Sequence, residues 1–119
     1  MTDLQTEIEK IKYQISLIGS ALSLDKHPIP SLVIQLGWSE KDLNDAHDIF
    51  EKYDALMQSN TSNATIGLES DLTQRFNIGY QTVKIIVLAF YKNHQWIDVC
   101  IDYAKSHDCI EFHEITKNH

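Results

Sequence analysis

Residues that could bind a metal ion stand at helical spacing near the C-terminal end of the chain. His94, Asp98 and Asp102 are four residues apart, so one continuous helix would place all three on a single face. Imidazole and carboxylate groups are ligands for zinc and for harder divalent ions. Three ligands from one helix leave the coordination shell incomplete, and polar residues at this spacing are typical of a solvated face. His47 and Glu51 repeat the pattern with one ligand fewer. We therefore predict no metal site and no cofactor.

Nucleophilic catalysis has one candidate outside the C-terminal tail, Cys100. This cysteine lies at helical spacing from Trp96 and Tyr103, which is typical of a small core residue with an unreactive thiol. The chain has no G-x-S-x-G nucleophile elbow, and its four glycines form no phosphate-binding loop. We therefore predict no catalytic residues and a protein that is not an enzyme.

Residues 68–86 resemble the helix-turn-helix motif of bacterial DNA-binding regulators. In such a motif the start of the second helix reads base edges and nearby cations neutralise phosphates. The residues that would contact DNA here are Arg75, Tyr80, Gln81 and Lys84. Only Arg75 and Lys84 are basic between residues 53 and 91, and the following turns are apolar. DNA binding is therefore the alternative hypothesis, and a helical hairpin within the core explains the same pattern with fewer assumptions.

The composition is that of one globular domain spanning residues 1–119. The chain has 10 Lys+Arg against 17 Asp+Glu, a formal net charge of −7, which is the wrong sign for a nucleic-acid partner. The longest apolar run, residues 85–91, is too short for a membrane span. The polar N-terminal sequence predicts no signal peptide, and two cysteines outside any CxxC pattern indicate reduced thiols. These features predict a cytoplasmic protein without a membrane partner.

The clearest periodic pattern lies at the N-terminus and predicts a long helix over residues 3–22. Apolar residues follow one another at alternating spacings of four and three, as in the a and d positions of a coiled coil. They are Leu4, Ile8, Ile11, Ile15, Ile18 and Leu22. A seam this regular can pack on its own domain or on a second copy, and we predict that residues 1–23 form a dimerisation helix.

The remaining elements predict an all-α fold, a compact bundle of five to six helices. Ser39 and Asp42 form the start of a long helix whose outer face carries acids at positions 42, 45, 48, 51 and 54. That face is either a solvated surface or a docking surface for a basic partner. The pattern also predicts an exposed loop over 59–67 and a frayed tail over 108–119. The other helices are expected over 31–36, 40–58, 67–77, 80–92 and 95–106.

Several segments resemble the small YhaI-like proteins of Bacillus-type bacteria. The similarity covers residues 6–107 and rests on spacing and apolar pattern, with 59–67 and 108–119 as departures. The segments that carry it are Ile8–Ile15, Leu24–Pro28, Leu36–Asp42 and Leu88–Trp96. The resemblance implies an all-helical, dimeric, cytosolic bacterial protein. It supplies no catalytic or binding residues, because the family has no established activity.

These observations together predict a homodimeric regulatory or accessory factor that acts through protein–protein contacts. The chain itself is the expected partner, with an unidentified second protein as a further possibility. The predicted dimer interface is the seam of Leu4, Ile8, Ile11, Ile15, Ile18 and Leu22.

Overall fold

The computed structural model describes residues 2–59, 64–107 and 109–117, and these residues form helices joined by short turns, without a strand. Two helices, over 40–58 and 80–92, have the bounds that the sequence predicts. The elements are α1 (Thr2–Ala21), α2 (Pro28–Leu36), α3 (Glu40–Gln58), α4 (Leu68–Phe76), α5 (Tyr80–Lys92), α6 (Ile97–Ser106), the 3-10 helix η1 (Ile110–Phe112) and α7 (His113–Thr116). The all-helical prediction is confirmed, and the described residues contain more than the five to six helices expected.

Local sequence explains where these helices begin and end. Helix α3 starts with a capping box, in which Ser39 accepts from the Asp42 amide and Asp42 accepts from the Ser39 amide. Helix α2 ends at Gly37, whose φ of 66° is the left-handed conformation that glycine adopts at low cost. Asn77 and His94 take the same conformation after α4 and α5, with φ of 53° and 58°.

The core of the molecule surrounds α5. Its side chains Val83, Ile86, Val87 and Phe90 are fully buried, because α2, α4 and α6 all pack against this helix. Helix α3 contributes Phe50, whose ring centroid lies 4.7 Å from that of Phe90. Residues 83–90 of this helix are apolar nearly all round, a pattern that is typical of the central buried helix of a fold.

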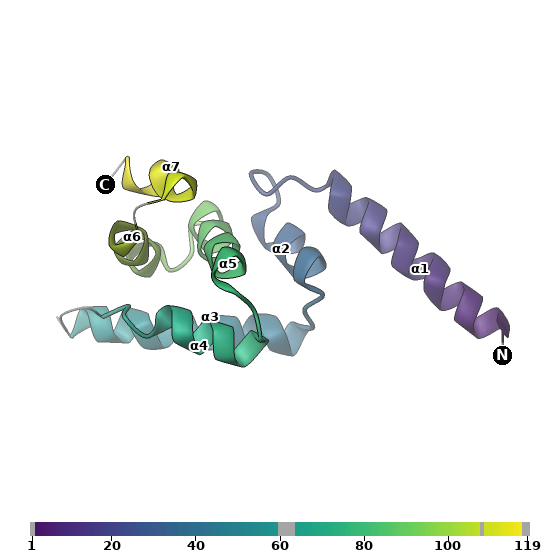
Figure 1. The fold of residues 1–119 in the computed structure, drawn as a ribbon, viewed down its shortest axis with the longest axis horizontal. Helices are drawn as coiled ribbons and strands as arrows, with labels where there is room; N and C mark the ends of the chain where they lie inside the picture. The colour runs from purple at the N-terminus through teal and green to yellow at the C-terminus, as the bar shows by residue number, and fades with distance from the viewer. Residues whose placement is uncertain (1, 60–63, 108, 118–119) are drawn as a thin grey trace.

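Helix α1 lies outside this core and projects from the body formed by α2–α7 (Figure 1). It packs against α2 near its C-terminal end, and the buried core contains no residue of α1. The molecule therefore measures 57 × 25 × 21 Å, far longer than it is wide. The compact bundle that the sequence predicts is formed by the body alone.

Two predictions about irregular segments differ from the structure within the described residues. The tail contains η1 and α7, and Phe112 and Ile115 are fully buried against the core instead of fraying. In the predicted loop, Ser59 and Ile66 are exposed as expected, but Ala64 and Thr65 are buried, and Thr65 donates to Asp102 over 2.6 Å. Both errors have one cause, since a few apolar or small residues gain order from distant partners that sequence spacing does not reveal. Residues 60–63, 108 and 118–119 lie outside the described residues.

The position of Phe90 gives a first testable prediction. Phe90→Ala should lower the free energy of unfolding by about 3–5 kcal/mol, because a fully buried phenyl ring leaves a cavity. Urea unfolding followed by circular dichroism measures the change. Ile66→Ala is the control, since Ile66 is 82% exposed and its loss should stay within about 0.5 kcal/mol. A loss below about 1 kcal/mol for Phe90→Ala would mean that α5 is not the centre of the core.

Candidate functional sites

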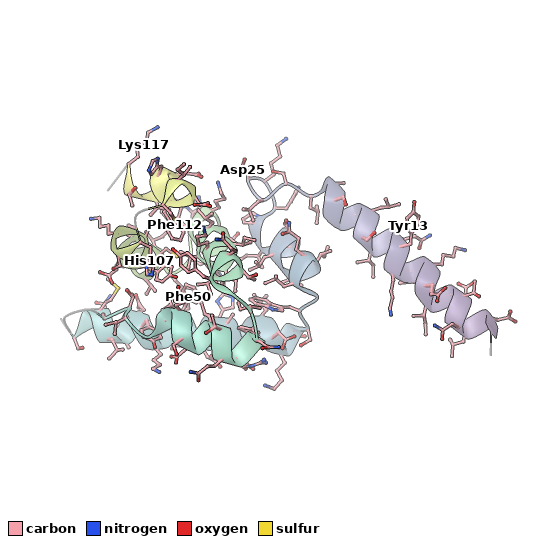
Figure 2. The ribbon with its side chains drawn as sticks, viewed as in Figure 1. Tyr13, Asp25, Phe50, His107, Phe112 and Lys117 are labelled. Atoms are coloured by element: carbon pink, nitrogen blue, oxygen red, sulfur yellow. The ribbon has the colours of Figure 1, made fainter. Side chains whose placement is uncertain are left out.

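The predicted seam of α1 forms an exposed apolar strip. Its five residues from Leu4 to Ile18 are 41–65% exposed, and Leu22 is partly buried where α1 meets the body. Tyr13 and Leu17 add apolar surface on another side of the same helix. Figure 2 shows the side chains of α1, Tyr13 among them, with no other element beside most of the helix. Contiguous exposed apolar surface of this kind marks an interaction site in soluble proteins.

A close contact seats α1 on the body. Gly19 is buried, and a Cβ atom at this position would lie 2.6 Å from the Cγ2 atom of Ile34 in α2. Glycine inside a helix costs about 1 kcal/mol relative to alanine, so its presence is explained by this close approach. Ser16 and Ser20 line the same hollow between α1 and α2. These small residues fix where α1 leaves the body.

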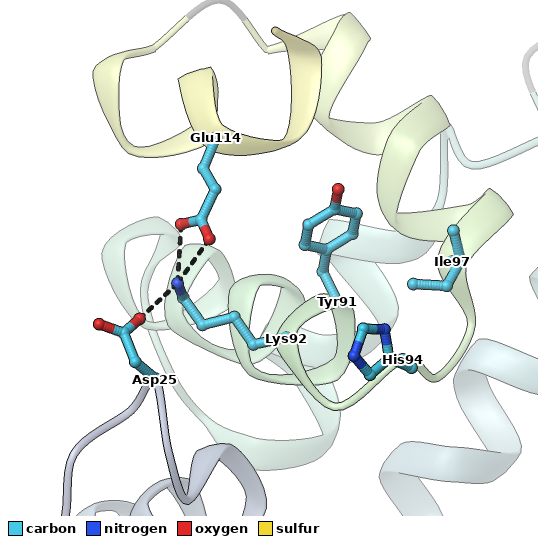
Figure 3. A pocket seen from close by; sticks show the side chains of 6 residues that line it. All are labelled: Asp25, Tyr91, Lys92, His94, Ile97 and Glu114. Atoms are coloured by element: carbon cyan, nitrogen blue, oxygen red, sulfur yellow. Dashed lines mark hydrogen bonds and ion pairs between the residues drawn. The ribbon is translucent and has the colours of Figure 1, made fainter. Parts of the chain in front are cut away.

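A second contact holds the connection between α1 and α2. The Lys92 ammonium donates to Asp25 in that connection over 2.7 Å, and to both carboxylate oxygens of Glu114 in α7 over 2.7 and 2.9 Å (Figure 3). The Lys92 side chain is 12% exposed. Burial alone would lower the pKa of Lys92, but the hydrogen bonds to Asp25 and Glu114 outweigh it and raise the pKa. The same bond lowers the pKa of Asp25.

These residues line an open hollow of about 710 Å³ beside α5 and α7. Tyr91, His94 and Ile97 complete its lining. The chemistry of the hollow is limited, because an amine with a raised pKa stays protonated at neutral pH and cannot attack an electrophile. The carboxylates of Asp25 and Glu114 also neutralise the ammonium charge, so the site does not attract an anionic ligand. Lys92 therefore acts as a structural clamp that joins three segments.

The three candidate metal ligands His94, Asp98 and Asp102 do not lie on one helical face in the structure. Helix α5 ends at Lys92, His94 follows it in a left-handed conformation, and α6 begins only at Ile97. His94 therefore does not share a helix with Asp98 and Asp102. Asp102 accepts a hydrogen bond from Thr65. The expectation of three residues on one helical face is therefore wrong. The described part of the chain contains no group of three residues placed to hold a metal ion.

His47, the other candidate ligand, bonds within the fold. Trp96 Nε1 donates to His47 Nδ1 over 3.0 Å. Because indole nitrogen can only donate, Nδ1 of His47 must be unprotonated. Burial lowers the pKa of His47, although the nearby charge of Asp48 opposes this shift. His47 also packs against the ring of Phe90 at 5.0 Å. Its role is to anchor the turn between α5 and α6.

The two cations of the DNA-binding alternative are already paired. Arg75 donates to Asp42 and Asp45 of α3 over 2.6–2.9 Å. The Lys84 side chain is only 7% exposed and donates to Glu111 over 3.0 Å. Tyr80 is partly buried and Gln81 is exposed at the start of α5. The segment does form a helix, a short turn and a second helix, but that second helix is the centre of the core.

The pairing of Arg75 also bears on the acidic face of α3. Asp45 accepts from Lys41 as well as from Arg75, which lowers the pKa of Asp45. Two of the five acids on this face, Asp42 and Asp45, therefore form ion pairs within the body. Asp48 and Glu51 remain exposed to solvent.

Cys100 is fully buried, and its thiol donates to the Val87 carbonyl oxygen over 3.5 Å. Burial raises the pKa of the Cys100 thiol, so the thiolate nucleophile is not available near neutral pH. The placement of Cys100 as a core residue is confirmed.

The sequence analysis did not identify the polar contacts between distant segments. The clamp of Asp25, Lys92 and Glu114 is one example, and the bond from Tyr53 to Asp71 over 2.5 Å is another. Their partners lie 18–67 residues apart in the chain, so no local pattern could have found them.

Comparison of the chain with protein-family models, with curated proteins and with solved structures finds no match. Within the described residues no helix has both the length and the apolar character needed to cross a membrane.

The bond between His47 and Trp96 predicts a pH dependence of stability. Because the folded state lowers the pKa of His47 below about 6.5, this contribution is complete above pH 6.5 and is lost as the pH falls through the folded pKa. The free energy of unfolding should decrease from pH 7 to pH 5.5. His47→Gln keeps an acceptor for Trp96 and removes the titration, so its decrease should be smaller, measured by urea unfolding at each pH.

His113→Gln serves as the control for this prediction, because it makes the same substitution at an exposed histidine outside the contact with Trp96. Equal slopes for the wild type and His47→Gln would show that His47 does not titrate differently in the two states.

Proposed function

We propose that this protein acts through protein–protein contacts as a homodimer held by the α1 seam, as a regulatory or accessory factor of the cytoplasm. One observation carries the proposal, namely the exposure of five large apolar residues along a helix that projects from a completed core. Burying apolar surface contributes about 25 cal/mol per Å². A second α1 presents an equally long and equally apolar seam, so pairing covers both.

The fold supports self-association in a second way. The body has its own core of α2–α7, so α1 is not needed to complete it. Gly19 and the Lys92 clamp fix the position of α1, which limits the conformational entropy that association would cost. The resemblance to YhaI-like proteins, which implies a dimer, points in the same direction.

The residue types in the seam bear on how many chains associate. Isoleucine at both a and d positions shifts isolated coiled coils toward three or four strands. Here the body occupies one side of α1 around Gly19, so the helix is less open at this end than a free coiled-coil peptide. We therefore propose two chains, related by a two-fold axis that makes each seam residue contact its own copy or a near neighbour.

Replacing Ile11 and Ile15 together by Asp tests the proposal. A two-fold contact would then contain four unpaired carboxylates in an apolar interface, a change that opposes association strongly. Light scattering after gel filtration should show a fall from twice 13.7 kDa to 13.7 kDa at about 50 µM chain. The circular dichroism signal of the body should persist, because its core lies outside α1.

The matched control replaces Tyr13 and Leu17 together by Asp. These residues are as exposed as the seam but lie on another side of α1, so this variant should remain a dimer. A wild-type mass of one chain, or of three, would contradict the proposal. Equal dissociation of both variants would show that the seam is not the interface.

A further inference from the structure

We propose that the two α1 helices of the dimer run parallel and in register, with Glu7 of each chain paired with the partner's Lys12. This inference rests on the proposed function, because it specifies how the second copy occupies the seam. Two observations support it. The charged residues beside the seam stand at complementary heptad positions, and they form no ion pair with the described residues of their own chain.

The heptad positions of the charged residues follow from the seam itself. With Leu4 and Ile11 at d and Ile8 at a, Glu7 falls at g and Lys12 at e, the two positions that border the seam. In a parallel pair, each g residue faces the e residue that comes five positions later in the partner. Glu7 therefore faces the partner's Lys12, and the symmetry axis produces this contact twice.

An antiparallel pair would lose this complementarity. In that pair the e positions of the two helices face each other, and so do the g positions. When the a residues of one seam pack against the d residues of the other, the centre of the overlap lies at Tyr13. Lys12 would then lie opposite the partner's Lys12, and Glu7 would lie opposite the partner's Ala21. Like charges at close range are unfavourable, so the charges of α1 select the parallel arrangement.

Both charges are free to make the proposed contact. Glu7 and Lys12 are exposed, and among the described residues neither forms an ion pair within its own chain. The other charges of α1 in the same region, Glu9 and Lys10, fall at b and c on the outer side of the helix. A salt bridge across the seam is thus available to one pair of positions only.

The parallel arrangement has a consequence for the shape of the dimer. Both bodies extend from the C-terminal end of α1, so they would lie side by side at one end of the helix pair. The two N-terminal tips would lie together at the other end. A protein bound by this dimer would meet two identical bodies at a separation that the seating of α1 on α2 determines.

Disulfide trapping tests the orientation. In a Cys109→Ser background, which keeps the buried Cys100, Leu4→Cys should form a cross-linked dimer on mild oxidation, because parallel d residues face each other. In the antiparallel pair the two Leu4 positions would lie about 27 Å apart, eighteen residues at 1.5 Å each. Non-reducing electrophoresis of the dimer measures the product.

The antiparallel arm of the experiment uses a mixture of Leu4→Cys and Leu22→Cys chains with tags of different size. The parallel dimer should yield no cross-link between the two kinds of chain, whereas an antiparallel dimer would yield chiefly that product. A dimer that Ile11→Asp and Ile15→Asp dissociate, but that gives this mixed product, overturns the orientation and leaves the proposed function standing. A monomeric wild type overturns the proposed function itself.

Charge reversal provides a second, independent readout. Glu7→Lys and Lys12→Glu should each weaken self-association on the order of tenfold, because each turns two attractive contacts into repulsive ones. Mixing the two variants should restore affinity, since both contacts are then attractive in the heterodimer. Glu9→Lys and Lys10→Glu are the matched controls and should leave the dissociation constant unchanged. Absence of preferential heterodimer formation would contradict the pairing of Glu7 with the partner's Lys12.

Discussion

The rest of the structure depends on burying one face of α5. Its residues Val83, Ile86, Val87 and Phe90 recur at spacings of three and four along that face, and all four are fully buried. Helices α2, α3, α4 and α6 supply the neighbours that cover it. The tail completes the enclosure through Phe112 and Ile115. The buried core formed in this way contains no residue of α1, and the apolar seam of α1 stays outside it.

The exclusion of α1 from the core leaves its apolar seam exposed to solvent. A helix with a regular apolar seam is normally buried by the rest of its own domain, but here the seam remains in solvent. Two contacts fix its direction, the close approach of Gly19 to Ile34 and the attachment of Asp25 to Lys92. A seam held in a fixed direction would lose little conformational entropy in the proposed dimer.

Basic residues have a structural role in this acidic protein. Arg75 ties α4 to α3, Lys84 ties α5 to the tail, and Lys92 ties α5 to both the tail and the connection after α1. Each of these cations is used to hold distant segments together. The chain as a whole keeps a net charge of −7.

The sequence alone determined the helices and much of the core, because periodicity and capping are local. The apolar spacing defined the seam of α1, and the apolar run of residues 85–91 marked the central helix. Capping residues such as Ser39 and Gly37 marked helix ends for the same reason. Only the tertiary structure decided that the seam stays outside the core and that the tail joins it. Those outcomes depend on contacts between residues far apart in the chain, such as Lys92 with Asp25. The spacing of residues along a local segment cannot predict such contacts.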